Sequence, residues 1–243
     1  MLSLILAAGM ASRLRPLTSH TPKCLLEIGG RSLLQRSMDA LIANGIDEFV
    51  FVTGYLHEQI EGFVARHYGD SIRTTFINND VYDSTNNIYS LWLARPAVEG
   101  KEVLLLDSDL LYDPAIITRV LASPEADVLT LIRHPLGEEE MKVVVDEQGR
   151  ITEISKTCQP SAAIGESLGI ERMSPAYTSA LYRELEPMMT TEGLQNIFYE
   201  RAFERLIPQG HTFSVLDVSD LFSCELDTVE DFEKAKKDSL NLL

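Results

Sequence analysis

Short apolar runs alternate with amphipathic stretches through the first half of the chain, and this alternation constrains the fold more than any other feature. The apolar runs predict buried strands over residues 2–6, 48–53, 72–77 and 102–106. The amphipathic stretches predict helices over residues 32–44, 57–68 and 84–95. Strands and helices that alternate in this way form a mostly parallel sheet with right-handed crossovers and helices on both faces.

The rhythm changes after about residue 130. Residues 141–146 and 150–154 predict an antiparallel hairpin whose turn includes Gly149. Further elements are predicted as a strand over 167–173, a helix from Pro175, a helix over 195–206, a strand over 212–217 and a helix over 228–237. We therefore expect one α/β domain over residues 1–243 with a Rossmann-like, mostly parallel mixed sheet flanked by helices. Its halves would be residues 1–130 and the hairpin-containing residues 131–243.

Charge and cysteine content exclude several classes of protein. The formal net charge of −16 disfavours nucleic acids and anionic membranes as main partners. Cys24, Cys158 and Cys224 are widely spaced and odd in number, which favours a reducing compartment. The apolar start of the chain has no basic region before it and is too short to span a bilayer. We expect a cytoplasmic protein.

The most specific motif follows the first predicted strand. It reads Leu-Ala-Ala-Gly-Met-Ala-Ser-Arg-Leu-Arg-Pro-Leu-Thr from Leu6, and Pro22-Lys23 comes shortly after it. Small residues after a buried strand let backbone N–H groups approach a polyphosphate. Arg13 and Lys23 supply the positive charge that a leaving pyrophosphate requires.

This motif resembles the signature of the nucleotide-sugar pyrophosphorylase-like nucleotidyltransferases. The family pattern usually has glycine where this chain has Ala11. The resemblance implies that Arg13 and Lys23 bind the triphosphate and act in catalysis, and that a homodimer is plausible. It places the nucleotide against the residues of the loop, to which we add two polar residues after later strands: Leu6, Ala7, Ala8, Gly9, Ala11, Ser12, Asn79 and Asp107.

Carboxylates after a later strand predict a metal site. Asp107 and Asp109 follow the strand over 102–106, and acids at the carboxyl end of a parallel strand face the ligand crevice. Because Mg²⁺ prefers one or two carboxylates plus phosphate oxygens, a second acid is expected from elsewhere. The family resemblance assigns the metal to Asp109 and Asp227; as an alternative, Asp227 is only a residue at the start of the last helix.

Two adjacent asparagines narrow the class of acceptor. Asn86 and Asn87 open the helix predicted over 84–95, where they either cap the helix or bind a ligand. The sequence Asn-Asn-Ile-Tyr-Ser-Leu resembles a motif of the cytidylyltransferases that act on small phosphorylated amines. We assign Asn86 to the nucleotide and Asn87 to the acceptor.

The acceptor side is predicted from residues of the second half. Lys142 and Lys156 lie on or beside the predicted hairpin and favour an anion site, and Glu166 belongs to a Gly-Glu-x-x-Gly stretch similar to one on the acceptor side of the family. Recognition of a methylated ammonium needs an aromatic cage. The single tryptophan, Trp92, is better explained as core packing, and Glu138 and Glu139 as a solvated turn.

The resemblance thus implies a Mg²⁺-assisted cytidylyltransferase that joins CMP from CTP to a small phosphonate or phosphate acceptor and releases pyrophosphate. The resemblance favours 2-aminoethylphosphonate as the acceptor. Three alternatives stay open: a phosphocholine cytidylyltransferase, a sugar-1-phosphate or inositol-1-phosphate nucleotidyltransferase, and a domain that binds a nucleotide without turning it over. The complete set of Arg13, Lys23, Asp109 and Asp227 disfavours the last of these.

Overall fold

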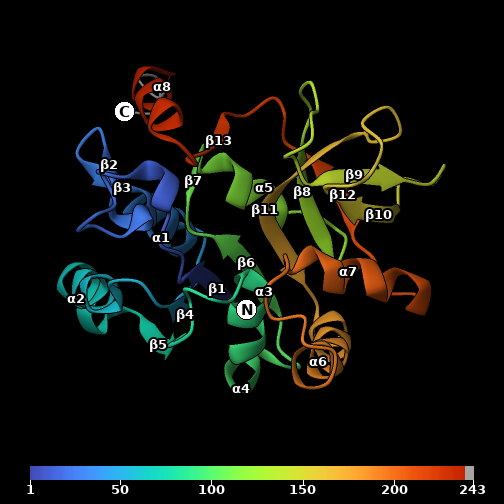
Figure 1. Cartoon of the computed structure of the whole chain (residues 1–243), viewed down its shortest axis with the longest axis horizontal. Coiled ribbons are helices and arrows are strands. Elements are labelled where there is room, and N and C mark those ends of the chain that lie inside the picture. Colours follow the sequence, from blue (N-terminus) through green and yellow to red (C-terminus); the bar gives the residue numbers. More distant parts are fainter. Residues whose placement is uncertain (239–243) are drawn as a thin grey trace.

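A nine-stranded mixed sheet forms the centre of the protein in a computed structural model that describes residues 1–238 (Figure 1). Its strands are β1 (Leu2–Ala7), β4 (Glu48–Thr53), β5 (Arg73–Asn78), β6 (Val103–Asp107), β8 (Val128–Ile132), β9 (Lys142–Val145), β10 (Ile151–Ser155), β11 (Gly165–Met173) and β12 (Ser214–Asp217). Seven of them follow the order β10-β9-β11-β6-β1-β4-β5, while β8 pairs with β11 and β12. The strands β6, β1, β4 and β5 are mutually parallel, and β11 runs antiparallel to β6.

Helices and two small ribbons complete the described chain. The α-helices are α1 (Leu33–Ala43), α2 (His57–Tyr68), α3 (Asn87–Leu93), α4 (Arg95–Val98), α5 (Ala115–Leu121), α6 (Pro175–Thr190), α7 (Glu200–Leu206) and α8 (Val229–Asp238). The 3₁₀ helices are η1 (Ser12–Leu14), η2 (Lys23–Leu25), η3 (Gly69–Ser71) and η4 (Ile207–Gln209). The ribbons pair β2 (Glu27–Ile28) with β3 (Arg31–Ser32) and β7 (Leu110–Tyr112) with β13 (Ser223–Glu225).

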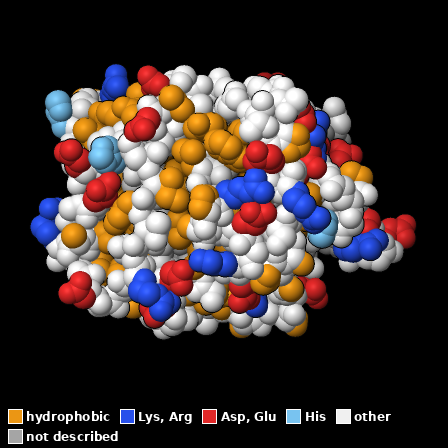
Figure 2. Space-filling model, turned by 90° about the horizontal axis from the view of Figure 1, so that it is seen from below, with side chains coloured by type: hydrophobic (Ala, Val, Ile, Leu, Met, Phe, Trp, Pro, Cys, Tyr) orange, Lys and Arg blue, Asp and Glu red, His pale blue; other side chains and the backbone are white. Residues whose placement is uncertain are grey.

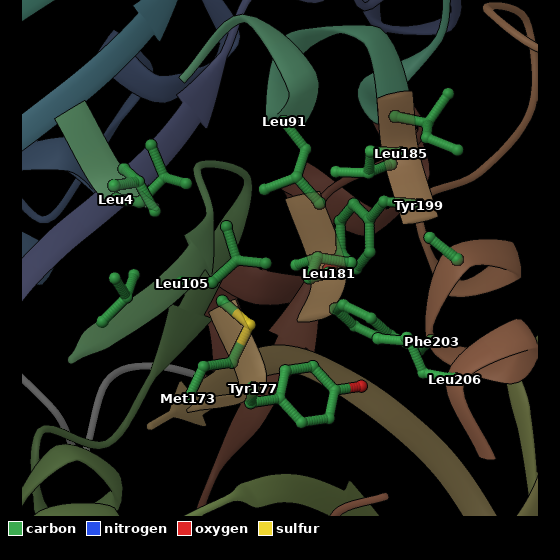
Figure 3. Packing of buried hydrophobic residues seen from close by; sticks show 14 of the residues in the cluster. Leu4, Leu91, Leu105, Met173, Tyr177, Leu181, Leu185, Tyr199, Phe203 and Leu206 are labelled. Carbon is green, nitrogen blue, oxygen red and sulfur yellow. The ribbon is translucent and has the colours of Figure 1, made fainter. Parts of the chain in front are cut away.

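Side chains of the parallel strands alternate between two apolar layers, one on each face of the sheet. In β6, Leu105 joins the layer formed with α3, α4, α6 and α7, whereas Leu104 and Leu106 join the layer formed with α1, α2 and α5. Figure 3 shows Leu105 in the first layer close to Leu181 of α6. Because successive strand residues point to opposite faces, burial on both sides requires the continuous apolar runs seen in the sequence. Truncation of the fully buried Leu105 to alanine would cost about 2–5 kcal/mol.

The observed elements confirm the predicted fold class and correct several details. The hairpin of β9 and β10 forms as predicted. The predicted helix over 84–95 begins only at Asn87, and Pro96 lies in the first turn of the separate helix α4 instead of ending α3. The predicted helix over 195–206 is confined to α7, so residues 195–199 precede it as a loop. The sequence analysis did not identify β7, α5 or β8.

The last helix closes a third apolar cluster beside the ribbon of β7 and β13. Phe232 of α8 packs there with Leu14, Leu26 and Leu111. The helix starts with a capping box: the Asp231 side chain accepts from the Thr228 backbone N–H at 2.8 Å, and the Thr228 hydroxyl accepts from the Asp231 N–H at 3.2 Å. This cap fixes the segment just before α8, which carries Asp227.

The surface shows no single-sign field on the face that Figure 2 presents, because basic and acidic side chains alternate there with scattered apolar ones. Among residues 1–238, no helix is long and apolar enough to cross a membrane.

Candidate active site

A cavity of about 700 Å³ opens at the carboxyl edge of the parallel strands. The residues that follow three strands line it: Ala8 and Gly9 after β1, Asn79 after β5, and Ser108 and Asp109 after β6. Ligands of open α/β sheets bind at this edge, where strand ends expose backbone groups that no neighbouring strand satisfies. The residues selected after these strands therefore lie at the edge of the sheet where open α/β folds bind ligands.

The loop after β1 is held by contacts that leave its first residues free to face the cavity. Leu14 is fully buried and anchors η1, and the Thr18 hydroxyl donates to the Ala11 carbonyl at 2.8 Å. The Tyr55 hydroxyl donates to the Thr18 carbonyl at 3.0 Å. Ala11 has a left-handed backbone with φ of 46°, a conformation that favours glycine. This geometry explains why glycine is the usual residue at this position of the motif.

Lys23 joins two carboxylates that are far apart in the sequence. Its Nζ lies 2.7 Å from Oδ2 of Asp109 and 2.9 Å from Oδ1 of Asp227. Burial lowers the pKa of Lys23, but the charges of the two aspartates outweigh it and leave the pKa above its usual value. The ammonium group is therefore charged at every physiological pH.

Arg13 adds a second cation at the mouth of the site. Its guanidinium donates to Oδ2 of Asp227 at 2.5 Å and is 63% exposed on the side-chain surface. Although burial alone would raise the pKa of Asp227, Lys23 and Arg13 lower it below its usual value. Two cations and two carboxylates thus meet where η2, β6 and the start of α8 converge.

A third carboxylate belongs to the same group. Oxygen atoms of Asp109, Glu225 and Asp227 lie within 4.8 Å of one another. Desolvation of the Glu225 carboxyl, together with the charges of Asp109 and Asp227, raises its pKa to about 8, and Lys23 offsets part of this rise. Oδ1 of Asp109 is buried and has no hydrogen-bond partner among the described residues. An oxygen-only donor set with a free buried carboxylate oxygen suits Mg²⁺.

Asp107 lies deeper in the site, beside Gly169. The Tyr199 hydroxyl donates to Oδ2 of Asp107 at 3.0 Å. Burial and the neighbouring acids, Asp109 first among them, raise the pKa of Asp107 well above its usual value. Gly169 has φ of 78°, and a Cβ added there would lie 2.7 Å from Oδ2 of Asp107. The strand β11 thus approaches Asp107 closely only because this residue is glycine.

Asn79, Asn86 and Asn87 make hydrogen bonds around the start of α3. Asn79 is buried, and its amide donates to the hydroxyls of Thr85 at 3.1 Å and Ser90 at 3.2 Å. Asn86 caps the helix through its own side-chain oxygen, which accepts from the Asn87 N–H. The Asn87 side-chain oxygen accepts from the Tyr199 N–H at 3.0 Å. All three asparagines line the cavity.

The lining of the cavity also contains charged groups and an aromatic ring from the second half of the chain. Nε2 of His134 lies 2.7 Å from Oε2 of Glu166. Nζ of Lys156 lies 3.6 Å from the Glu139 carboxylate and 4.6 Å from the centre of the Phe198 ring. Except for His134, these residues line the cavity.

A profile of the MobA-like NTP transferase domain matches residues 3–202. The chain belongs to this family. The match confirms the nucleotidyltransferase class predicted from the loop motif; its span contains Arg13, Lys23 and Asp109, whereas Asp227 lies outside it.

Relatives of known function share parts of the same sequence. A CMP-5'-(3-aminopropyl)phosphonate synthase of Streptomyces rubellomurinus is 29% identical over 250 residues, which cover 96% of this chain and 38% of that protein. A choline-phosphate cytidylyltransferase of Streptococcus pneumoniae is 36% identical over 110 residues, which cover 45% of this chain and 46% of that protein. The chain thus matches less than half of the length of either relative.

A solved structure supports the fold over a larger share of the chain. The CTP:phosphocholine cytidylyltransferase of Streptococcus pneumoniae has a TM-score of 0.78 with this NTP transferase domain at 20% sequence identity. The superposition covers 98% of both chains. It confirms the nucleotidyltransferase fold for almost the whole domain.

Most of the residues selected from the sequence lie together in one cavity. They are Leu6, Ala7, Ala8, Gly9, Ala11, Arg13, Lys23, Asn79, Asn86, Asn87, Asp107, Asp109, Lys156, Glu166 and Asp227. Ser12 is not part of the cavity lining, and neither is Lys142. The Lys142 side chain is 1% exposed, and Nζ donates to the carbonyls of Gly137 at 2.9 Å and Glu140 at 3.1 Å. The prediction that Lys142 lines an anion site is therefore wrong, because its side chain binds carbonyls of the turn before β9 and does not reach the cavity.

Twelve residues that line the cavity were not selected from the sequence, among them Glu139, Tyr82 and Phe198. Glu139 was explained as part of a solvated turn, and Tyr82 and Phe198 were not considered. Trp92 follows the predicted packing role, since it lies in α3 against the first apolar layer and donates to Glu186 at 3.2 Å. No signal in the sequence singled out Phe198, because its exposure depends on how its loop attaches to the start of α3.

Proposed function

We propose that the chain is a CTP-dependent cytidylyltransferase that joins CMP to a small phosphonate or phosphate acceptor bearing an amine. The observation that carries this proposal is the bridge from Lys23 to Asp109 and Asp227 at the carboxyl edge of the parallel strands. Cations and acids at this edge suit a nucleoside triphosphate and a divalent ion. The named relatives act on or form compounds of this chemical class.

The proposed reaction is one direct displacement. An oxygen of the acceptor attacks the α-phosphorus of CTP and forms a new P–O bond, while the bond between the α-phosphorus and the bridging oxygen breaks and pyrophosphate leaves. A phosphonate or phosphate dianion is already a nucleophile near neutral pH, so the chain need not supply a general base. Catalysis then depends on positioning and on stabilisation of negative charge.

Two cations of this chain have separate roles in the proposal. Lys23 stabilises the charge that develops at the α-phosphate, because its buried ammonium is held in place by two carboxylates. The more exposed Arg13 binds the β- and γ-phosphates that leave. Asp109 and Asp227, with Glu225 beside them, would hold Mg²⁺. When bound, this ion neutralises phosphate charge and orients the phosphate oxygens.

In this proposal, CTP and the acceptor bind to different parts of the cavity. The loop after β1 binds CTP, and Asn79, Asn86 and Asp107 contact the nucleotide from the floor of the cavity. The acceptor approaches from β11, which carries Glu166, and from the start of α3, which carries Asn87. Its phosphonate must point toward the α-phosphate, so its amine points away from the α-phosphate.

We propose 2-aminoethylphosphonate as the acceptor. Glu139, Glu140 and Glu166 line the cavity and suit a primary ammonium with three donors. Phosphocholine is the second candidate because the exposed ring of Phe198 offers a face for a methylated ammonium.

The test is pyrophosphate release from CTP and Mg²⁺ with three acceptors: 2-aminoethylphosphonate, phosphocholine and glucose-1-phosphate. The proposal expects turnover with the first acceptor at the highest kcat/KM. Asp109→Asn is expected to reduce turnover at least 100-fold. Asp220→Asn is the matched control, since Asp220 pairs with Arg119 in an exposed ion pair outside the cavity. Turnover restricted to the sugar phosphate, or an Asp109→Asn variant as active as the control, would contradict the proposal.

A further inference from the structure

Lys156 occupies a position that suits the ammonium group of a ligand. Its Nζ lies over the Phe198 ring, 4.6 Å from the ring centre, and 3.6 Å from a carboxylate oxygen of Glu139. Lys156 also lowers the pKa of the nearby buried Glu200. An aromatic face and a carboxylate thus lie beside one primary ammonium in the cavity.

Contacts of the neighbouring loop residues fix the position of the Phe198 ring. The next residue, Tyr199, is fully buried and donates its backbone N–H to Asn87. Earlier in the same loop, the Gln195 carbonyl accepts from the Asn86 N–H at 2.9 Å. Two hydrogen bonds to the start of α3 therefore fix a loop whose aromatic side chain remains 41% exposed.

A second pairing of a lysine with a phenylalanine shows what a purely structural contact looks like in this chain. On α8, Nζ of Lys236 lies 4.5 Å from the centre of the Phe232 ring and 2.9 Å from Glu233. Phe232 is 5% exposed and packs in the third apolar cluster. Phe198 differs because its ring remains exposed and lines the cavity, where a ligand can reach it.

We propose that the face of Phe198, with Glu139 beside it, binds the ammonium group of the acceptor, and that Lys156 fills this place until the acceptor arrives. This inference rests on the proposed function and names the group that this part of the site recognises. It also changes the role assigned to Lys156, from a ligand for the acceptor's anion to a competitor of its cation.

The contacts of Lys156 are weak enough for such an exchange. The Glu139 side chain is 87% exposed, and ion pairs of exposed groups contribute little because water competes for both partners. The ammonium group of the acceptor is linked to a phosphonate that binds at the metal end of the cavity. When it replaces the ammonium group of Lys156, the Phe198 ring still contacts a cation. An acceptor without an amine gains nothing from the ring.

The test compares Lys156→Met and Phe198→Leu with wild type, using 2-aminoethylphosphonate and ethylphosphonate as acceptors. Kd is measured by calorimetry at saturating CTP in the presence of Ca²⁺ in place of Mg²⁺, and KM is measured by pyrophosphate release. Phe198→Leu should raise Kd for 2-aminoethylphosphonate about 10-fold and leave ethylphosphonate within about twofold. Lys156→Met should lower Kd for 2-aminoethylphosphonate about threefold and leave ethylphosphonate unchanged. Lys236→Met is the matched control and should change neither value.

Several outcomes would overturn the inference. A Lys156→Met variant that binds both acceptors more weakly would make Lys156 an anion ligand. Equal losses for both acceptors in Phe198→Leu would show a general packing role. Phe198→Tyr, which keeps the ring, should retain the wild-type preference for 2-aminoethylphosphonate over ethylphosphonate, and loss of that preference would also contradict the inference. Wild type that does not bind 2-aminoethylphosphonate would also reject the inference. Binding with the expected selectivity but without pyrophosphate release would instead reject only the proposed function.

Discussion

Replacement of Lys142 by methionine separates a structural role from a role in acceptor binding. The sequence favours an anion site at Lys142, whereas the structure buries its side chain and directs Nζ to three backbone carbonyls of the turn before β9. Methionine preserves the length and the apolar stem but removes the charge and all three donors. The variant should therefore lose stability and retain its affinity for the acceptor.

The size of the loss follows from the contacts. A hydrogen bond with a charged group contributes about 1.5–3 kcal/mol. Gly137 and Glu138 are exposed, so water can bind their carbonyl oxygens in place of Lys142. The net loss therefore corresponds to about one or two hydrogen bonds. We expect a decrease of about 2–4 kcal/mol in the free energy of unfolding, which lowers Tm by about 5–15 °C for a chain of this length.

The assay is thermal denaturation followed by circular dichroism, together with KM for the acceptor well below Tm. Lys101→Met is the control, because Lys101 is half-exposed and its ion pair with Glu48 spans 3.6 Å. This control should lose less than about 1 kcal/mol. A Lys142→Met variant that melts like wild type but has a KM raised about 10-fold or more for the acceptor would refute the structural interpretation.

Three further predictions concern Arg13, Gly169 and Glu200. Arg13→Ala should raise KM for CTP about 10-fold in steady-state kinetics, with Tm unchanged because Arg13 is largely exposed; an unchanged KM would exclude Arg13 from the triphosphate site. Gly169→Ala should cost about 1–3 kcal/mol in urea denaturation, since alanine is strained at φ of 78° and its Cβ would collide with Asp107; equal midpoints would contradict this geometry. Burial raises the pKa of Glu200 to about 7, so the contribution of this carboxyl group to stability falls as pH rises from about 4.5 to 7. Glu200→Gln should therefore gain about 2–3 kcal/mol relative to wild type between pH 5 and pH 8, and a pH-independent difference would reject the raised pKa.

The strands of the parallel half were predictable because they are covered on both faces. Such strands are continuous apolar runs, and β4 is found at the residues that the sequence indicates. The strand β8 was missed because residues 128–132 lie across the point where the rhythm changes. Its neighbours β11 and β12 are distant in sequence, so local patterning does not reveal the pairing.

The site was predictable where a motif carries the chemistry and unpredictable where packing decides it. Lys23, Asp109 and Asp227 are spread over more than 200 residues, yet Lys23 belongs to the loop motif and each aspartate stands next to a recognisable strand or helix end. The sequence shows that Lys142 is a cation but not that carbonyls of its own turn bind it. Similarly, the exposure of Phe198 depends on the attachment of its loop to α3, which is a contact between distant segments.

The most direct test of the account is ³¹P NMR of the protein incubated with CTP, Mg²⁺ and 2-aminoethylphosphonate. We predict equal amounts of pyrophosphate and of a CMP ester whose phosphonate and phosphate resonances are coupled through one bridging oxygen. Lys23→Ala should form this product at least 100 times more slowly. Product formation by Lys23→Ala at the wild-type rate, or no ester with any amine-bearing phosphonate or phosphate, would contradict the central claim.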